Sequence, residues 1–206
     1  MIQKSELAER LILACEQVIA AQDELTDIDS RFGDADHGIT MTKICTAIRD
    51  AVSQASGDIK SMLDDAAMAV MMINGGSAVP LWNTWLDGLS MHAPAAATMT
   101  ADELKTMFRG AYEELAPLSK AKVGDKTMMD ALIPATEALI ACEGDADKLL
   151  TAAAEAAEEG AQASKGFVSK FGRARSYGEK TLGTPDAGAV SMKYFFAGLA
   201  SRKQKN

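Results

Sequence analysis

The chain has 206 residues, of which 48% are hydrophobic and 24% are charged, and its formal net charge is −8. This size and composition predict one globular domain over residues 1–206 with a hydrophobic core. An acidic surface repels phosphate backbones, which argues against a nucleic-acid-binding protein, and no window is apolar enough for a membrane span.

The N-terminal segment and the cysteines favour a cytoplasmic protein. Residues 1–10 carry four charged side chains and no apolar run, so we expect no secretory signal peptide. Cys15, Cys45 and Cys142 are far apart in the sequence and lie in apolar or alanine-rich stretches. We therefore expect three reduced thiols buried in the core, without a disulfide or a zinc site.

Apolar residues recur every three to four positions along most of the chain, a pattern that predicts helices. The eight predicted helices cover residues 7–21, 41–52, 63–73, 81–89, 104–115, 131–142, 149–165 and 187–201. Thr100 and Glu103 have the spacing of a capping box before the fifth helix. Trp82 and Trp85 lie at helical spacing and are expected to fill the core or an interface. Without any convincing strand pattern, eight helices with short connections predict an all-α, antiparallel up-and-down bundle or barrel.

Glycine-bearing segments interrupt this pattern at the ends of predicted helices. They cover residues 31–38, 74–80, 123–127 and 171–188. Because binding groups concentrate on loops that a rigid scaffold holds, these segments are the candidates for chemistry.

The acidic segment at residues 29–38 reads DSRFGDADHG and places Asp29, Asp34 and Asp36 within eight residues. Carboxylate oxygens at this density suit Mg²⁺, which completes its octahedron with water and phosphate oxygens. The alternative is a turn in which an aspartate caps an ordinary helix. The spacing does not fit an EF-hand, because Cys45 stands at the position of its bidentate glutamate, and the chain has no Glu-x-x-His motif of a di-iron site.

The other segments give weaker signals. Residues 74–78 read NGGSA and precede Pro80, which suits an anion-binding loop at a helix start, although an ordinary loop fits equally. Residues 124–127 lack the upstream glycine of a P-loop. Arg173 and Arg175 would suit phosphate, and Asp186 would cap the last helix or hold a purine or ribose. A solvated basic loop explains the arginines equally well.

The motif at residues 33–38, GDADHG, preceded by Asp29, resembles the signature of the L subunit of dihydroxyacetone kinases. That subunit is the nucleotide-binding domain of its family. The similarity continues, in order, at residues 75–76, 124–128, 172–174 and 186–189. The resemblance therefore extends over most of the chain.

The resemblance implies an eight-helix antiparallel barrel with ADP or ATP bound at one end. Asp29, Asp34 and Asp36 would be the catalytic residues and would hold two Mg²⁺ ions that bridge the phosphates. The residues that it implies for nucleotide binding are His37, Gly38, Ile39 and Thr40 at a helix start, Ser77 and Ala78 at the phosphates, and Met128, Arg173, Asp186, Ala187 and Gly188 further out. The alternative for His37 is that it only braces the aspartates.

The resemblance also implies a function. The chain would be the phosphoryl-donating subunit of a kinase for dihydroxyacetone or a related short-chain sugar, which a separate K subunit holds on a histidine. ATP or a protein of the phosphotransferase system would supply the phosphoryl group, and whether the chain forms a homodimer stays open.

Four residues depart from the family pattern. Ala78 and Val79 replace a Ser-Gly pair, so that Ser77 would have to supply the hydroxyl, while Asn83 replaces a glycine and Ala187 replaces a proline. These departures support an alternative function, that of a non-catalytic nucleotide-binding paralogue with a regulatory role.

Overall fold

The computed structural model describes residues 1–202, and within them the protein is almost entirely helical. The α-helices of this part of the chain are α1 (Lys4–Ala20), α2 (Gln22–Ser30), α3 (His37–Gln54), α4 (Ile59–Met71), α5 (Ala78–His92), α6 (Ala101–Ser119), α7 (Met129–Ala141), α8 (Ala146–Ala163) and α9 (Ala187–Ala200). Two 3₁₀ helices, η1 (Ser164–Gly166) and η2 (Arg173–Thr181), lie between α8 and α9.

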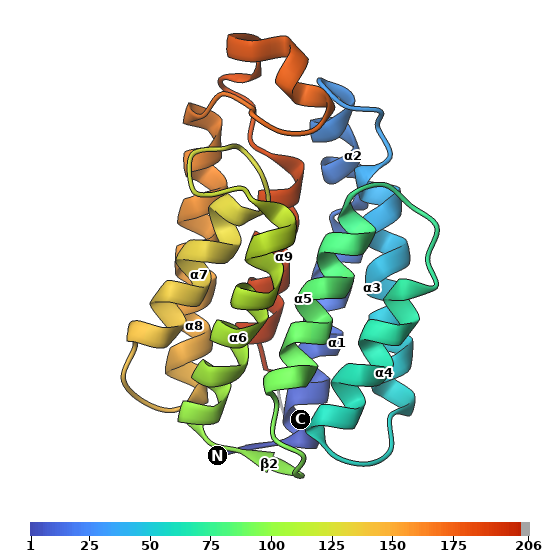
Figure 1. The fold of residues 1–206 in the computed structure, drawn as a ribbon, viewed down its shortest axis with the longest axis vertical. Coiled ribbons are helices and arrows are strands. Elements are labelled where there is room, and N and C mark those ends of the chain that lie inside the picture. The colour runs from blue at the N-terminus through green and yellow to red at the C-terminus, as the bar shows by residue number, and fades with distance from the viewer. Residues whose placement is uncertain (203–206) are drawn as a thin grey trace.

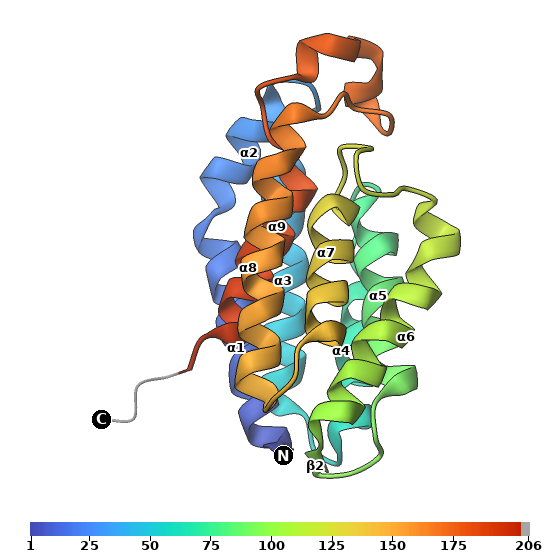
Figure 2. The same cartoon turned by 90° about the vertical axis from the view of Figure 1, so that its left-hand side faces the viewer.

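The helices form a closed ring, which confirms the predicted all-α antiparallel barrel. Each helix from α3 to α9 packs against the next one in the chain, and α1 packs against both α3 and α9, which closes the ring. α2 extends α1 beyond Ala21 and packs on α3 and α9, so that the ring itself has eight members. In this ring α3 lies opposite α7, and α5 lies opposite α9. Figure 2 shows the same arrangement from the side.

Glycines allow the closest helix contacts of the ring. A Cβ atom on Gly198 of α9 would collide with the backbone of Ala14 on α1, and one on Gly160 of α8 would collide with the carbonyl oxygen of Asp130 on α7. Each pair of helices therefore meets backbone to backbone, at a distance that no larger residue permits.

The core is filled by an aromatic cluster, as the helical spacing of the tryptophans predicts. Trp82 and Trp85 are buried and meet edge to face with ring centroids 5.6 Å apart, and Phe195 lies 5.1 Å and 5.6 Å from them. Such edge-to-face geometry stabilises aromatic pairs beyond the burial of their area.

The cysteines follow the prediction in part. Cys15 and Cys45 are buried, and burial raises the pKa of the Cys45 thiol well above its usual value. Cys142 is only half-buried, because it caps the C-terminus of α7 and does not lie inside the helix.

The capping box of α6 is confirmed. Thr100 accepts a hydrogen bond from the backbone N–H of Glu103, whose carboxylate accepts one from the backbone of Thr100. Just before it, β2 (Thr98–Met99) pairs with β1 (Ile2–Gln3) in an antiparallel ribbon of two residues per strand, which the sequence did not predict. No helix among residues 1–202 is long and apolar enough to cross a bilayer.

Candidate functional site

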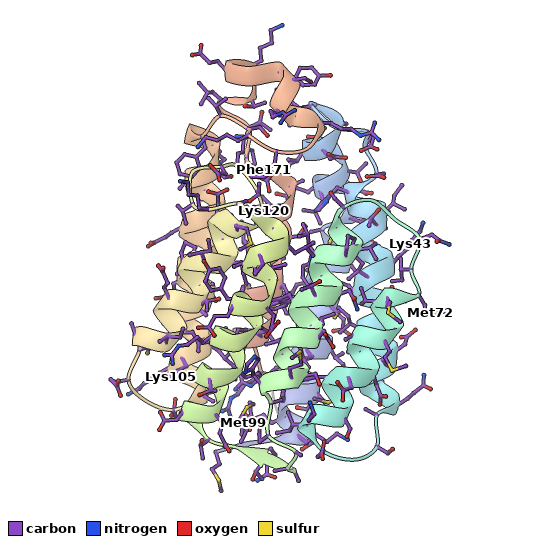
Figure 3. All side chains as sticks on the ribbon, viewed as in Figure 1. Lys43, Met72, Met99, Lys105, Lys120 and Phe171 are labelled. Atoms are coloured by element: carbon purple, nitrogen blue, oxygen red, sulfur yellow. The ribbon has the colours of Figure 1, made fainter. Side chains whose placement is uncertain are left out.

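A cavity of about 680 Å³ opens at the end of the barrel where residues 31–36, 72–77, 120–128 and 164–186 connect the helices. The segment that contains η2 lies across this end in both views of the ribbon. Phe171, which lines the cavity, and Met99 mark the two ends of the barrel in Figure 3.

Twelve of the fourteen residues predicted for the site line this cavity. They are Asp29, Asp34, Asp36, His37, Thr40, Ser77, Ala78, Met128, Arg173, Asp186, Ala187 and Gly188. Gly38 and Ile39 do not line it. A Cβ atom on Gly38 would collide with the carbonyl oxygen of Gln22, so this glycine lets α3 pack on α2, and Ile39 is exposed on α3.

The three aspartates of the acidic segment converge on one point, with carboxylate oxygens that lie within 4.8 Å of one another. Asp29 stands in the last turn of α2, and its Oδ2 accepts the backbone N–H groups of Asp36 at 3.1 Å and of His37 at 3.4 Å. Gly33 packs on this carboxylate so closely that a Cβ atom would collide with it. Local backbone contacts therefore hold the cluster in place.

The cluster carries more negative charge than its surroundings neutralise. The pKa of Asp36 is raised, first by partial burial and then by repulsion from Asp34 and Asp29. Arg173 forms an ion pair with Asp34 at 2.8 Å and opposes this shift. Three hard oxygen ligands with excess negative charge fit a divalent cation such as Mg²⁺, which takes carboxylates together with water and phosphate oxygens.

Four helices begin at the cavity, and three of them, α3, α5 and α7, have no side-chain cap. Their N-cap residues, Asp36, Ser77 and Met128, make no capping hydrogen bond, whereas Asp186 caps α9 by accepting the N–H of Ala189 at 2.8 Å. The N–H of His37 already donates to Asp29 and that of Met129 to Thr127 Oγ1, and the N–H groups that remain free at helix starts attract anions. A Cβ atom on Gly76 would lie 4.0 Å from Asp36, so the start of α5 adjoins the acidic cluster.

His37 joins two helices beside the cluster. Its Nε2 lies 2.8 Å from Ser191 Oγ on α9, and its backbone N–H donates to Asp29. Burial lowers the pKa of His37, and the nearby charge of Asp29 opposes this effect. The imidazole therefore braces α3 against α9 while it also lines the cavity.

Sequence reasoning missed the cavity-lining residue Lys126. Its side chain is 5% exposed, and its Nζ donates to the carbonyl oxygens of Ser164, at 2.7 Å, and of Thr184. We call residues 124–130 and 184–188, which meet at this side chain, the Lys126 wall. The similarity to the kinase L subunit at residues 124–128 includes this lysine, but the sequence does not reveal its hydrogen-bond partners.

Apolar residues that the sequence reasoning did not assign also line the cavity. They are Pro80, Leu81, Trp82, Leu118 and Phe171. The cavity thus combines an acidic cluster, helix starts and apolar surface, a combination that suits a ligand with both an anionic and an apolar part.

An antiparallel helical barrel with an acidic cluster and open helix starts at one end is the architecture that the sequence resemblance implied. The family described as the DAK2 domain matches residues 31–201. The chain belongs to this family.

Relatives with known names are kinases or kinase subunits. The chain is 31% identical over 191 residues to the ADP-binding subunit of the PEP-dependent dihydroxyacetone kinase of Escherichia coli, covering 90% of this chain and 91% of that one. It is 36% identical over 183 residues to D-erythrulose kinase of Mycolicibacterium smegmatis, covering 86% of this chain but only 32% of the relative. The chain therefore spans about a third of the longer kinase and nearly all of the separate subunit.

The fold also matches solved structures. The dihydroxyacetone kinase of C. freundii, in complex with AMP-PNP and Mg²⁺, superimposes with a TM-score of 0.70 at 23% identity, covering 94% of this chain and 33% of that one. Its native form gives a TM-score of 0.72, with 97% of this chain and 35% of that one covered. At this identity the match supports the barrel fold alone.

Proposed function

We propose that the protein is the nucleotide-binding, phosphoryl-donating subunit of a Mg²⁺-dependent kinase for dihydroxyacetone or a related short-chain sugar. The observation that carries this proposal is the acidic cluster beside open helix starts in one cavity. The named relatives support it, since they include an ADP-binding subunit and an erythrulose kinase.

In this proposal Asp29, Asp34 and Asp36 hold two Mg²⁺ ions, and the chemistry that such ions supply is neutralisation of phosphate charge. Asp29 keeps its orientation because two backbone N–H groups bind it. The N–H of Ala78 at the start of α5 and the exposed Ser77 hydroxyl orient the terminal phosphate, since Val79 N–H donates to Gly76 and Pro80 has no N–H. Phosphoryl transfer depends mainly on such positioning and charge neutralisation.

The far side of the cavity holds the nucleoside. Met128 and residues 186–188 offer apolar surface and a carboxyl group, and Leu118 and Phe171 add apolar area. Gly38, Ile39 and Thr40 belong to the first turn of α3, from which their backbones contribute to the positive end of the helix dipole. Arg173, paired with Asp34, is available for phosphate.

The acceptor sugar is supplied by a separate K subunit, a proposal that the near-complete coverage of the E. coli subunit supports. ATP and a phosphotransferase-system protein are both retained as sources of the phosphoryl group, in a cytoplasmic setting. A measurement of the oligomeric state in solution tests whether the chain forms a homodimer.

The test measures ADP binding by calorimetry with and without Mg²⁺ in the parent protein and in Asp36→Ala. We expect the variant to lose affinity roughly 100-fold in Mg²⁺, because the cluster loses a ligand. Asp65→Ala on α4 is the matched control, since Asp65 is exposed and outside the cavity. Equal Mg²⁺-dependent affinity of Asp36→Ala and the parent would refute the site assignment.

A second function, that of a non-catalytic nucleotide-binding paralogue, is favoured by Val79. This side chain is buried, and its Cγ2 packs so closely on Gly75 that a Cβ atom there would lie 2.8 Å away. The α5 start is therefore stiffer than a Ser-Gly pair would make it. Binding of nucleotide without phosphoryl transfer to dihydroxyacetone, in the presence of an active K subunit, would select this function.

A further inference from the structure

Lys126 is a cationic side chain that lies almost entirely inside the protein. It is 5% exposed, and burial lowers the pKa of its ammonium group, while Asp186 and Asp130 oppose that effect. Its backbone has a φ of 60°, a left-handed conformation that is unusual for a residue with a side chain. A buried charge in an uncommon backbone conformation persists only where its surroundings hold it.

The ammonium group connects segments that are far apart in the sequence. Nζ donates to the carbonyl oxygen of Ser164, where α8 ends, and to that of Thr184, just before α9. The Ser164 hydroxyl in turn accepts the backbone N–H of Asp186 at 2.9 Å. One side chain thus joins the start of α7, the end of α8 and the start of α9.

A buried carboxylate fixes the loop that carries Lys126. Asp130 is 1% exposed and accepts the backbone N–H groups of Gly124 and Thr127, both at 2.6 Å. Both side chains therefore fix the loop: Asp130 accepts N–H groups within it, and Lys126 ties it to the carbonyl oxygens of Ser164 and Thr184. Because charge-assisted hydrogen bonds are strong in a buried setting, the loop has its shape before any ligand binds.

The part of this wall that faces the cavity is formed by Met128 and residues 186–188. A Cβ atom on Gly188 would lie 3.2 Å from the backbone nitrogen of Met128, so that the two segments touch. The wall lies at the starts of α7 and α9, and α7 stands opposite α3, whose start adjoins the acidic cluster. The α9 part of the wall borders His37, whose Nε2 lies 2.8 Å from Ser191 Oγ, so a ligand whose phosphates lie at the cluster extends past the start of α9 toward the α7 part of this wall.

We propose that Lys126 is a positioning residue that holds the Lys126 wall against the nucleoside part of the ligand, so that preference for a nucleotide over bare polyphosphate depends on it. This inference rests on the proposed function. Lys126 acts through the backbone of the wall and leaves the phosphate end to the aspartates.

The test compares two ligands, Mg-ADP and Mg-pyrophosphate, by calorimetry on the full chain. Lys126→Met keeps most of the side-chain length and removes the charge. We expect this variant to bind Mg-ADP about 10-fold or more weakly, because two charge-assisted hydrogen bonds are lost, and to bind Mg-pyrophosphate within about twofold of the parent.

Lys170→Met is the matched control. Lys170 also pairs with a residue of this region, Asp125, at 2.7 Å, but its side chain is 57% exposed. We expect this variant to bind both ligands within about twofold of the parent, because Lys170 does not contact Ser164 or Thr184 and its backbone N–H still donates to the carbonyl oxygen of Asp125.

Two results would overturn the inference: an equal loss of both ligands in Lys126→Met, which a general loss of structure produces, or unchanged Mg-ADP affinity. If Lys126→Met does not fold, Ser164→Ala takes its place, since it removes the hydroxyl that holds the Asp186 N–H and leaves Lys126 intact. This variant should weaken Mg-ADP about threefold and leave Mg-pyrophosphate unchanged, and an equal effect on both ligands contradicts the proposal. A parent protein that binds neither ligand in Mg²⁺ would instead refute the proposed function itself.

Discussion

The acidic cluster and the Lys126 wall occupy the same cavity but differ in how their charges are balanced. Three carboxylates meet in the cluster, two of them exposed, and Arg173 forms an ion pair with one of them, Asp34. In the wall, Lys126 donates to two carbonyl oxygens, and Asp130 accepts two backbone N–H groups. The cluster is thus left with excess charge, whereas the wall is satisfied by the protein alone.

This difference separates two roles that a binding site needs. A surface with excess charge gains stability when a ligand or ion of opposite charge arrives, whereas a satisfied surface supplies a fixed shape. Changes in the cluster should therefore alter ligand binding without loss of fold, and changes that disturb the wall should alter stability as well.

The largest effect is expected where α8 supports the wall. Gly160→Ala would force a Cβ atom against the carbonyl oxygen of Asp130, so α8 has to move away from α7. We expect the free energy of unfolding in urea to fall by about 3 kcal/mol. Gly166→Ala is the control, since nothing lies within 4 Å of its Cβ position, and it should change stability by less than about 0.5 kcal/mol. Similar values for the two variants would contradict the close packing.

The cluster should show the opposite behaviour. Asp29→Asn keeps an oxygen for the N–H groups of Asp36 and His37 but removes one of three repelling charges, so the unliganded protein should be no less stable. ADP with Mg²⁺ at 100 times the dissociation constant should stabilise the parent by about 2.7 kcal/mol. At the same ligand concentrations ADP with Mg²⁺ should stabilise the variant against unfolding far less than it stabilises the parent. Thermal unfolding with and without ligand measures both quantities, and a full ligand effect in the variant would exclude Asp29 as a metal ligand.

The charge of Asp186 gives a pH test of the wall. Burial raises the pKa of Asp186 to about 7, so the folded protein keeps a proton that the unfolded chain releases near pH 4. Stability from this group is present below pH 4 and is lost as the pH rises through about 7.

Asp186→Asn keeps a capping oxygen for α9 and removes the titration. Between pH 5 and pH 8 the free energy of unfolding of the parent should fall by roughly 2–3 kcal/mol relative to the variant. Urea unfolding at four pH values gives the comparison, and parallel profiles would show that Asp186 does not titrate in this range.

The smallest effect is expected far from both regions. Thr100→Ala removes the capping box of α6 at the opposite end of the barrel and should cost about 1 kcal/mol. ADP affinity in Mg²⁺ should stay the same. A change in ADP affinity would mean that a loss of stability anywhere in the barrel alters ligand binding. The separate roles assigned to the cluster and the wall would then be contradicted.

The fold was predictable from the sequence because eight amphipathic stripes each bury one face in the same ring. α2 was missed, since Leu25 and Ile28 are its only buried residues and its acidic side chains read as part of a loop. η2 was missed for a related reason: its segment is polar, rich in glycine and too irregular for helical periodicity. Element type follows from periodicity only where a whole face is buried.

The site was predictable where its residues are close in the sequence. Asp34 and Asp36 belong to one short motif, and twelve of the fourteen predicted residues line the cavity. Lys126 has partners 38 and 58 positions away, which no local pattern reveals. Gly38 looked like a nucleotide contact, but it packs against Gln22, a contact that depends on the angle between α2 and α3.

The positions of the first strand and of the last helix have a practical consequence. Ile2 and the end of α9 at Ala200 both lie at the end of the barrel remote from the cavity (Figure 1). A fluorescent label, an affinity tag or a further polypeptide joined there leaves the cavity mouth open. The same barrel therefore suits both a free-standing subunit and a module inside a longer chain.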